Sequence, residues 1–186
     1  MIVLGTTHEG PVYARTDSQV DALIDHIMND LPQGSTTPDG YAIMPEKAVV
    51  SIVKGKYPEE TDERWARNFL YVTVNTRNGY GALRWWTPDT PDGADEEHVS
   101  RFIWTSGNPT PPSFDPKLIF DPGTPSYYPP EAAIPVAQVR SALEEFCRAR
   151  TGERPEYVPW RNRVRVRRSG SRNRRTRGSG PPDGPL

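Results

Sequence analysis

The charged residues divide the chain sharply near Trp160. Residues 161–186 hold nine Arg and one Asp, a net charge of +8, and their only large apolar side chains are Val164, Val166 and Leu186. Residues 1–160 hold 14 Lys or Arg against 23 Asp or Glu, a net charge of −9. A segment that can bury so little apolar surface does not offset the entropy lost on folding. The sequence therefore predicts one folded domain over residues 1–160 and a disordered Arg-rich tail over residues 161–186.

The length of the acidic part predicts a single core, because about 160 residues are too few for two. The one cysteine, Cys147, allows no disulfide within the chain, which is typical of a reducing cytosol. The N-terminal residues lack the basic and apolar regions of a secretory signal, and no run reaches the roughly 18 apolar residues of a membrane span. We expect a cytoplasmic protein that has no contact with a membrane.

Two amphipathic helices are predicted, one near each end of the acidic domain. The first follows a capping box formed by Thr16 and Gln19, and Pro32 with Gly34 ends it. Its apolar residues are spaced to share one face: Val20, Leu23, Ile24, Ile27 and Leu31. The second helix begins at Ile134–Pro135, and Gly152 is the expected stop. Its apolar stripe consists of Val136, Val139, Leu143, Phe146 and Cys147.

A short strand is predicted before the first helix, and successive antiparallel strands are predicted between the two helices. Residue types that favour strands concentrate in the runs 11–15, 48–54, 69–74, 80–86 and 102–105, and Asn78–Gly79 favours a tight hairpin turn. Residues 88–135 hold 11 prolines in 48 positions, which disfavours central strands and indicates long loops across the sheet. The predicted fold class is α+β: an antiparallel meander sheet packed by two main helices, with long proline-rich loops.

The residue types that catalysis or metal binding needs show no recognisable spacing. His8, His26 and His98 are far apart in sequence and have no metal-ligand spacing to Cys147. Cys147 falls on the apolar face of the second helix, where a buried side chain rather than a nucleophile is expected. We therefore expect no enzyme, no catalytic residue, no metal and no cofactor. A hydrolase that uses loop carboxylates is the weakest alternative, because no base or nucleophile accompanies them.

Two clusters of carboxylates flank the predicted meander. The first holds Glu59, Glu60, Asp62 and Glu63. The second holds Asp89, Asp92, Asp95, Glu96 and Glu97. The residues leave two interpretations open: solvated loops that keep the protein soluble, or an acidic face that competes for a basic, nucleic-acid-binding surface.

Tryptophan is the other candidate for a partner contact. In residues 80–86, Leu83 and Trp85 share one face of the predicted strand, whereas Arg84 and Trp86 share the other. One tryptophan is expected in the core, and the second half-exposed or covered by a proline-rich loop. Because Trp is enriched at binding hot spots, Trp86 is a candidate contact residue.

The Arg-rich tail suggests a second class of function. Its arginines are interleaved with Ser, Gly and Asn, and it has no aromatic side chain on which a base could stack. Any contact with nucleic acid would be weak, non-specific and strongly salt-dependent. The alternative function is therefore a nucleic-acid-associated protein that acts through this tail.

The order of four short motifs resembles a known family. Gly81–Trp85 on a strand is followed by a proline-rich stretch with Tyr127–Tyr128, then by the helical run Ile134–Phe146 and by TGERPEYVPW at Thr151–Trp160. This order is similar to that of the first numbered immunity-protein family of bacterial polymorphic toxin systems. The resemblance covers about residues 11–160 and excludes the tail.

The resemblance implies a small, non-enzymatic α+β protein, encoded beside a toxin and neutralising it by direct binding. Because immunity proteins of this family are often paired with nucleic-acid deaminase toxins, the resemblance implies a DNA or RNA deaminase as the toxin, and we expect a nuclease otherwise. The motif residues are expected to be structural: Gly81, Leu83, Trp85, Gly152, Pro155 and Trp160. We therefore expect an immunity protein, monomeric when free, that occludes the active-site cleft of a cytosol-acting toxin with its acidic surface.

Overall fold

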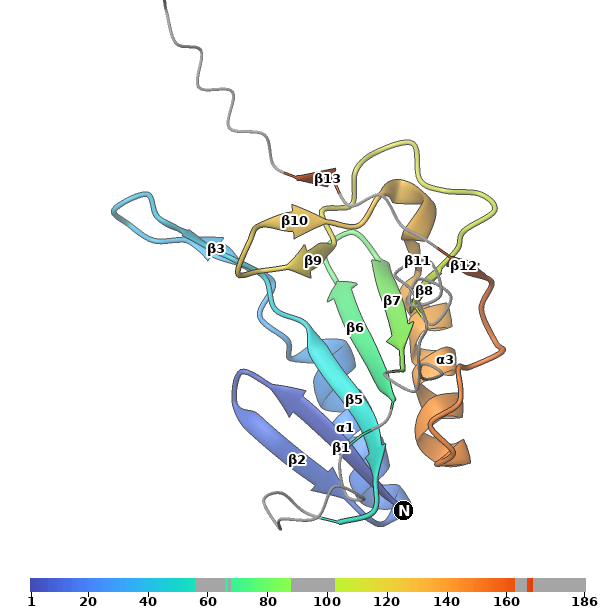
Figure 1. Cartoon of the computed structure of the whole chain (residues 1–186). Coiled ribbons are helices and arrows are strands. Elements are labelled where there is room, and N and C mark those ends of the chain that lie inside the picture. Colours follow the sequence, from blue (N-terminus) through green and yellow to red (C-terminus); the bar gives the residue numbers. More distant parts are fainter. Residues whose placement is uncertain (56–65, 67, 88–102, 163–166, 169–186) are drawn as a thin grey trace, which may run out of the picture.

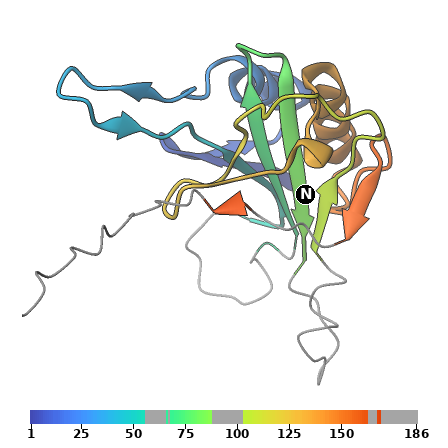
Figure 2. The same cartoon turned by 90° about the horizontal axis from the view of Figure 1, so that it is seen from above.

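The computed structural model describes residues 1–55, 66, 68–87, 103–162 and 167–168. Two helices, α1 (Asp17–Asn29) and α3 (Val136–Ala149), lie side by side against one face of a large sheet (Figure 1). The view from above shows both helices on the same side of the strands (Figure 2). The predicted α+β fold class is confirmed. No helix in the described part of the chain has the length and apolar character needed to cross a membrane.

The sheet has eight strands, and its centre is an antiparallel meander as predicted. The meander consists of β5 (Ala48–Val53), β6 (Phe69–Asn75), β7 (Tyr80–Trp86) and β8 (Ile103–Ser106), in that spatial order. The Asn78–Gly79 turn joins β6 to β7, with Gly79 at a φ of 77°. Two short strands complete this side: β12 (Trp160–Asn162) pairs with β8, and β11 (Ile134–Pro135) pairs with β7.

The N-terminal hairpin extends the sheet beyond β5. It consists of β1 (Ile2–Thr7) and β2 (Gly10–Ala14), with β1 between β5 and the edge strand β2. The predicted strand at residues 11–15 corresponds to β2, whereas β1 was not predicted. Because β1 pairs on both sides, its residues Ile2, Val3 and Leu4 are buried.

Helix α1 begins at the predicted capping box. The backbone N–H of Gln19 donates to Thr16 Oγ1 at 3.3 Å, and the backbone N–H of Thr16 donates to Gln19 Oε1 at 3.2 Å. The five predicted apolar residues are all buried, together with Met28. The helix ends at Asn29, and the backbone N–H of Asp30 donates to the His26 carbonyl at 2.9 Å.

The predicted stop of the second helix was wrong. Helix α3 ends at Ala149, and the residue with left-handed backbone is Arg150, with a φ of 52°. The backbone N–H of Arg150 donates to the Phe146 carbonyl at 3.3 Å, and its side chain pairs with Asp17 of α1 at 3.0 Å. Gly152 also has a positive φ, of 82°, but it lies two residues further on and is buried.

The main core lies between the two helices and the sheet. Alternate strand residues such as Val50, Leu70, Val72 and Leu83 are fully buried there. They meet helix residues of the predicted stripes: Leu23, Ile24, Ile27, Leu143 and Phe146. Burial of such side chains contributes about 1.5–3 kcal/mol each, so this layer supplies most of the stability of the domain.

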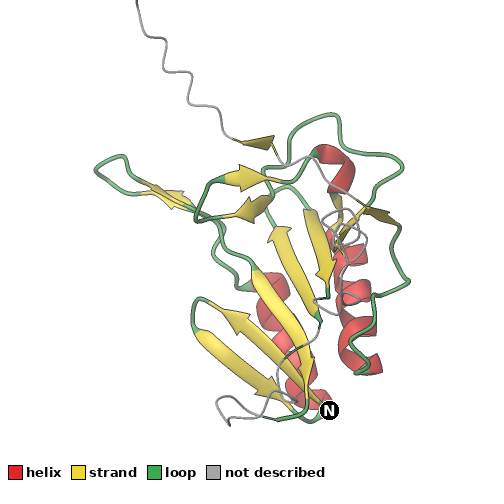
Figure 3. Ribbon diagram, in the orientation of Figure 1, coloured by secondary structure: helices red, strands yellow, loops and turns green. Residues whose placement is uncertain are grey.

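The proline-rich segment covers part of the opposite sheet face, as predicted (Figure 3). It contains β9 (Ile119–Asp121), β10 (Ser126–Tyr127) and a short 3₁₀ helix, η3 (Pro130–Ala132). Leu118 and Tyr128 pack against Ala82 of β7, and Thr73 Oγ1 donates to the Ile119 carbonyl at 2.9 Å. We refer to the sheet face opposite α1 and α3 as the open face, because neither of these helices covers it.

The expected domain boundary at residue 160 falls inside a strand. Arg161 and Asn162 continue β12 and pair with Thr105 and Trp104 of β8. Within the expected tail, β13 (Arg167–Arg168) pairs with β10. The other tail residues lie outside the described residues, so the expectation of disorder there stays a prediction.

Candidate functional site

The nine carboxylates expected to contact a partner lie outside the described residues. They are Glu59, Glu60, Asp62, Glu63, Asp89, Asp92, Asp95, Glu96 and Glu97. Residues 54–68 join β5 to β6, and residues 87–102 join β7 to β8. In the sheet register Phe69 pairs with Trp86, and Trp86 pairs with Ile103. Both acidic segments are therefore attached to the same end of the sheet, which we call the acidic end.

Trp86 is the one expected contact residue that the structure describes. It lies half-buried on the open face at the acidic end, next to Arg84 as the alternation predicted. Its ring stacks on Phe69 of β6, with centroids 4.9 Å apart and planes inclined by 22°. Trp85 lies on the other face and packs against the main core. Trp86 and Phe69 together form an aromatic platform at the end of the sheet to which the acidic segments are attached.

A mainly apolar groove runs along the open face from this platform toward β2. It has a volume of about 380 Å³. Its lining comes from four strands and the segment before β6: Leu4, Thr6, Pro11, Tyr13, Val49, Ser51, Ala66 and Phe69. We call it the sheet groove. Apolar concavities of this kind are typical of the centre of a protein–protein interface.

Arg84 and Lys47 lie in a cluster of aromatic side chains on the open face. The guanidinium carbon of Arg84 lies 3.9 Å from the ring centroid of Tyr71 and 4.6 Å from that of Phe120. Lys47 Nζ donates to the Phe120 carbonyl at 2.9 Å, and burial, followed by the charge of Arg84, lowers the Lys47 pKa. Burial raises the pKa of the neighbouring Tyr128 far above its usual value. This cluster stabilises the loop cover of the sheet through cation–π contacts.

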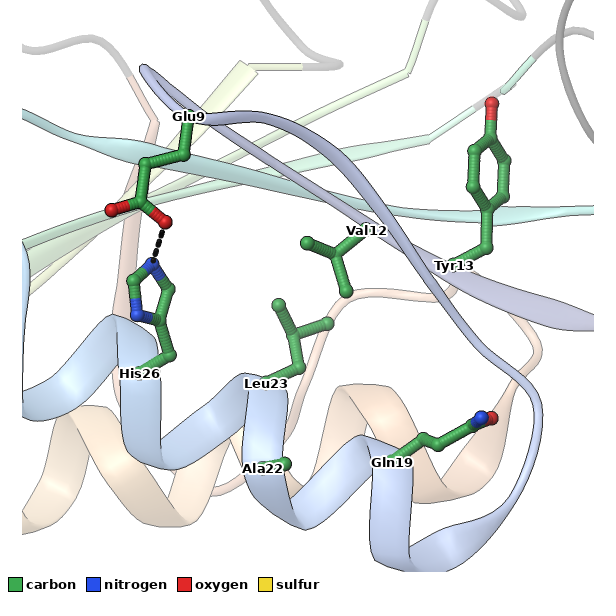
Figure 4. Close-up of a pocket in the computed structure, with 7 residues that line it drawn as sticks. All are labelled: Glu9, Val12, Tyr13, Gln19, Ala22, Leu23 and His26. Carbon is green, nitrogen blue, oxygen red and sulfur yellow. Dashed lines mark ion pairs between the residues drawn. The ribbon is translucent and has the colours of Figure 1, made fainter.

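A second groove lies on the other side of the edge strand, between β2 and α1 (Figure 4). It has a volume of about 360 Å³, and Val12, Ala22 and Leu23 provide its apolar surface. Its rim carries His26, whose Nε2 lies 3.7 Å from Glu9 Oε2. Figure 4 shows Val12 and Leu23 turned toward one another, with the Glu9–His26 pair beside them.

The carboxylates of α1 are paired with two arginines of α3 and with Arg150, which follows it. Asp25 accepts from Arg140 at 2.7 Å, Asp21 from Arg148 at 2.8 Å, and Asp17 from Arg150 at 3.0 Å. These three cross-helix pairs neutralise the acidic side of α1. Each of these three carboxylates is therefore paired with an arginine.

The residues of the sequence motif make contacts within the chain. Trp85 Nε1 donates to the Gly152 carbonyl at 3.1 Å, and Trp160 Nε1 donates to the Pro155 carbonyl at 2.6 Å. Gly152 packs against the Asn68 side chain so closely that a Cβ has no room, and Gly81 is similarly confined by Thr73 and Val139. Leu83 is fully buried in the main core. These contacts tie the segment after α3 to the sheet and support a structural role for the motif.

The described residues contain no group of three or more His, Cys, Asp or Glu side chains that could hold a metal ion. Cys147 is buried on α3 as predicted, and burial raises its pKa to about 12, so it remains a neutral thiol near pH 7. His8 Nδ1 pairs with Glu46 at 2.6 Å, and His26 Nδ1 lies 3.4 Å from Asp30. His98 lies outside the described residues.

Sequence reasoning missed the sheet groove and a projecting ribbon. The groove depends on the pairing of β1 between β2 and β5, which no local pattern indicated. The ribbon consists of β3 (Ser35–Thr36) and β4 (Ala42–Ile43) and stands out from the body (Figures 1 and 2). Tyr41, 73% exposed, lies next to it in a short polar segment, and this lone aromatic residue was the one available signal.

The comparison with protein families identifies the chain. Residues 8–162, well over half of its length, match the family described as Immunity protein Imm1. No curated protein and no solved structure matches the chain. The matched region contains every strand of the large sheet except β1, both helices and the Trp85–Gly152 contact, and it ends at the last residue of β12. The chain belongs to the Imm1 family of immunity proteins, and its partner is a cognate toxin.

Proposed function

We propose that this immunity protein neutralises a toxin that acts on nucleic acid, a deaminase in the first instance and otherwise a nuclease. It acts in the cytoplasm by binding, as a monomer when free, and catalyses no reaction. The toxin is encoded next to it. The acidic end of the sheet covers the active-site cleft of the toxin, so that nucleic acid is excluded.

The distribution of charge is the observation that supports this proposal. The acidic residues of α1 are neutralised by Arg140, Arg148 and Arg150. The nine carboxylates of the two acidic segments are attached to one end of the sheet instead. A cleft that binds a polyanion presents Lys and Arg, so an acidic surface is attracted to it and competes with nucleic acid.

The neighbouring structure provides the apolar part of such an interface. The Phe69–Trp86 platform and the sheet groove lie beside the points where the acidic segments leave the sheet. Interfaces commonly combine a buried aromatic or apolar centre with a charged rim. In this arrangement the carboxylates accelerate association, and the groove and Trp86 slow dissociation.

Co-expression tests the proposal. Cells that produce the C-terminal domain of the adjacent toxin should survive when they also produce the full immunity protein. A chain that ends at Asn162 keeps β12 and should protect equally well, provided that its melting temperature matches that of the full chain. Protection lost together with DNA binding on this truncation would instead support the alternative function through the Arg-rich tail.

A further inference from the structure

The β3–β4 ribbon projects from the body (Figures 1 and 2), and all four residues of its two strands are exposed. Its strands pair only with each other, through Ser35 with Ile43 and Thr36 with Ala42. Tyr41 is 73% exposed and Ile43 is 52% exposed, and Tyr41 is the most exposed large apolar residue among the described residues. These side chains contribute little to the core, so the fold does not explain their presence.

The root of the ribbon is fixed to the body. The backbone N–H of Glu46 donates to the Pro32 carbonyl at 2.9 Å, and Arg77 of the β6–β7 turn donates to the Gly34 carbonyl at 3.3 Å. Gly34 has a φ of 75°, and a Cβ there would lie 2.8 Å from the Pro45 nitrogen. The direction of the ribbon is therefore set before a partner binds, which lowers the entropy cost of binding.

The tip of the ribbon is an ordered turn. Thr37 and Tyr41 bond twice: the backbone N–H of Thr37 donates to the Tyr41 carbonyl at 2.8 Å, and the backbone N–H of Tyr41 donates to Thr37 Oγ1 at 3.0 Å. The N–H of Gly40 donates to the Thr37 carbonyl at 2.9 Å. Asp39 is the only Asp, Glu, Lys, Arg or His in residues 33–45. The turn thus presents one carboxylate and one phenol ring, two residues apart and both exposed to solvent.

An aromatic ring next to an anion is also what a nucleotide presents to its binding site. Sites for single-stranded nucleic acid combine aromatic faces, on which bases stack, with cations that bind the backbone. A two-stranded ribbon, with strands about 4.8 Å apart, is narrow enough to enter a cleft that the eight-stranded body cannot enter. The ribbon leads into the start of β5, and the first acidic segment follows its end, so the two are separated by at least one six-residue strand, about 20 Å.

We propose that the β3–β4 ribbon is a toxin-binding arm whose tip enters the nucleic-acid cleft of the cognate toxin, with Tyr41 in the position of a base and Asp39 in the position of a phosphate. This inference rests on the proposed function, because it takes a toxin that acts on nucleic acid as the partner. It adds the contact that blocks the cleft and the residues that make it.

The test measures the affinity of the full-length protein for the toxin domain, with and without a single-stranded oligonucleotide. Tyr41→Ala is expected to weaken binding by at least about thirty-fold, as loss of a hot-spot residue does. Tyr41→Phe keeps the ring and should bind as the wild type does. Asp39→Asn should weaken binding and reduce its salt dependence. Tyr157→Ala is the matched control, because Tyr157 is similarly exposed, at 60%, but lies after α3.

The outcomes separate this inference from the proposed function. If the wild type binds the toxin and Tyr41→Ala binds it equally well, the β3–β4 ribbon is not a toxin-binding arm. The proposed immunity function is unaffected by that result. If Tyr41→Ala weakens binding but the toxin binds the oligonucleotide and the immunity protein at the same time, the ribbon does not enter the nucleic-acid cleft. If the wild type neither binds nor protects, the proposed function fails, and this inference fails with it. Unchanged melting temperatures for Tyr41→Ala and Tyr157→Ala exclude loss of the fold as the cause of weaker binding.

Discussion

Trp85 donates its indole N–H to the carbonyl of Gly152 at 3.1 Å, across 67 residues of sequence. This bond joins the strand end nearest the acidic end to the segment that follows α3. Gly152 fits there because its φ of 82° and its contact with Asn68 leave no place for a side chain. Asn68 in turn accepts a bond from the backbone N–H of Ile52 at 2.9 Å, which connects the same point to β5.

Gly152→Ala should therefore destabilise the protein by about 2 kcal/mol or more, because the new Cβ adds a clash with Asn68 to the backbone strain. Gly79→Ala is the matched control. Gly79 has a similar φ of 77° but open space around it, so its replacement should cost only about 1 kcal/mol. Urea unfolding of both variants gives the difference, and equal costs would contradict the close packing of Gly152.

The cross-helix pair of Arg140 with Asp25 should contribute little to stability. The Asp25 side chain is 61% exposed and that of Arg140 is 36% exposed, and such surface pairs contribute about 0.2–1 kcal/mol. A double-mutant cycle with Arg140→Ala and Asp25→Ala measures the coupling at low and high salt. We expect a coupling within that range that falls as salt increases, and unchanged toxin binding. Loss of toxin binding in either variant would place the interface on the helix layer.

Cys147 should be unreactive in the folded protein. Burial raises its pKa to about 12, whereas a cysteine in an unfolded chain ionises near pH 8.5. A thiol reagent at pH 8 should modify it quickly in denaturant and very slowly in the native state. Fast labelling of the native protein would show that the α3 core opens readily.

The raised pKa of Cys147 also makes the free energy of unfolding depend on pH. The folded state keeps the thiol proton in a range where the unfolded chain releases it, so this group lowers stability as pH rises from about 8.5 toward 12. The decrease in unfolding free energy between pH 8 and pH 10 should be smaller in Cys147→Ala than in the wild type. Identical slopes would contradict a buried neutral thiol.

The acidic segments should govern the rate of association. Reversal of Glu96 and Glu97 to Lys should slow association with the toxin at low salt, by about tenfold or more, with little change at high salt. Reversal of Glu131 and Glu144 changes the net charge equally, but these residues lie on η3 and α3. Stopped-flow kinetics compare the two. An equal effect of both pairs would show that only net charge matters.

Elements that depend on residues close together in the sequence could be predicted from it. The capping box of Thr16 and Gln19, the turn at Asn78–Gly79 and the apolar stripes of α1 and α3 act within a few residues, so each could be predicted. Strand β1 could not, because its burial depends on pairing with both β2 and β5. Gly152 was misassigned because a glycine after a helix usually caps it, whereas here Arg150 adopts the left-handed backbone.

In the candidate site, too, the sequence predicted some features and not others. The alternation in β7 correctly placed Trp86 and Arg84 on one face, because side chains alternate along a strand. The stacking of Trp86 on Phe69 and the sheet groove arise from the order of the strands, which the sequence does not show directly. That both acidic segments attach to one end of the sheet follows from the strand register.

We propose that the acidic end of the sheet neutralises a toxin that acts on nucleic acid. The most direct measurement is the activity of the purified toxin domain of the adjacent gene on a DNA or RNA substrate, titrated with the wild type and with a variant in which Asp92, Asp95, Glu96 and Glu97 are all Lys. We predict stoichiometric inhibition by the wild type, and inhibition by the variant only at much higher concentration, with an unchanged melting temperature. Equal inhibition by both proteins at low salt would contradict the claim.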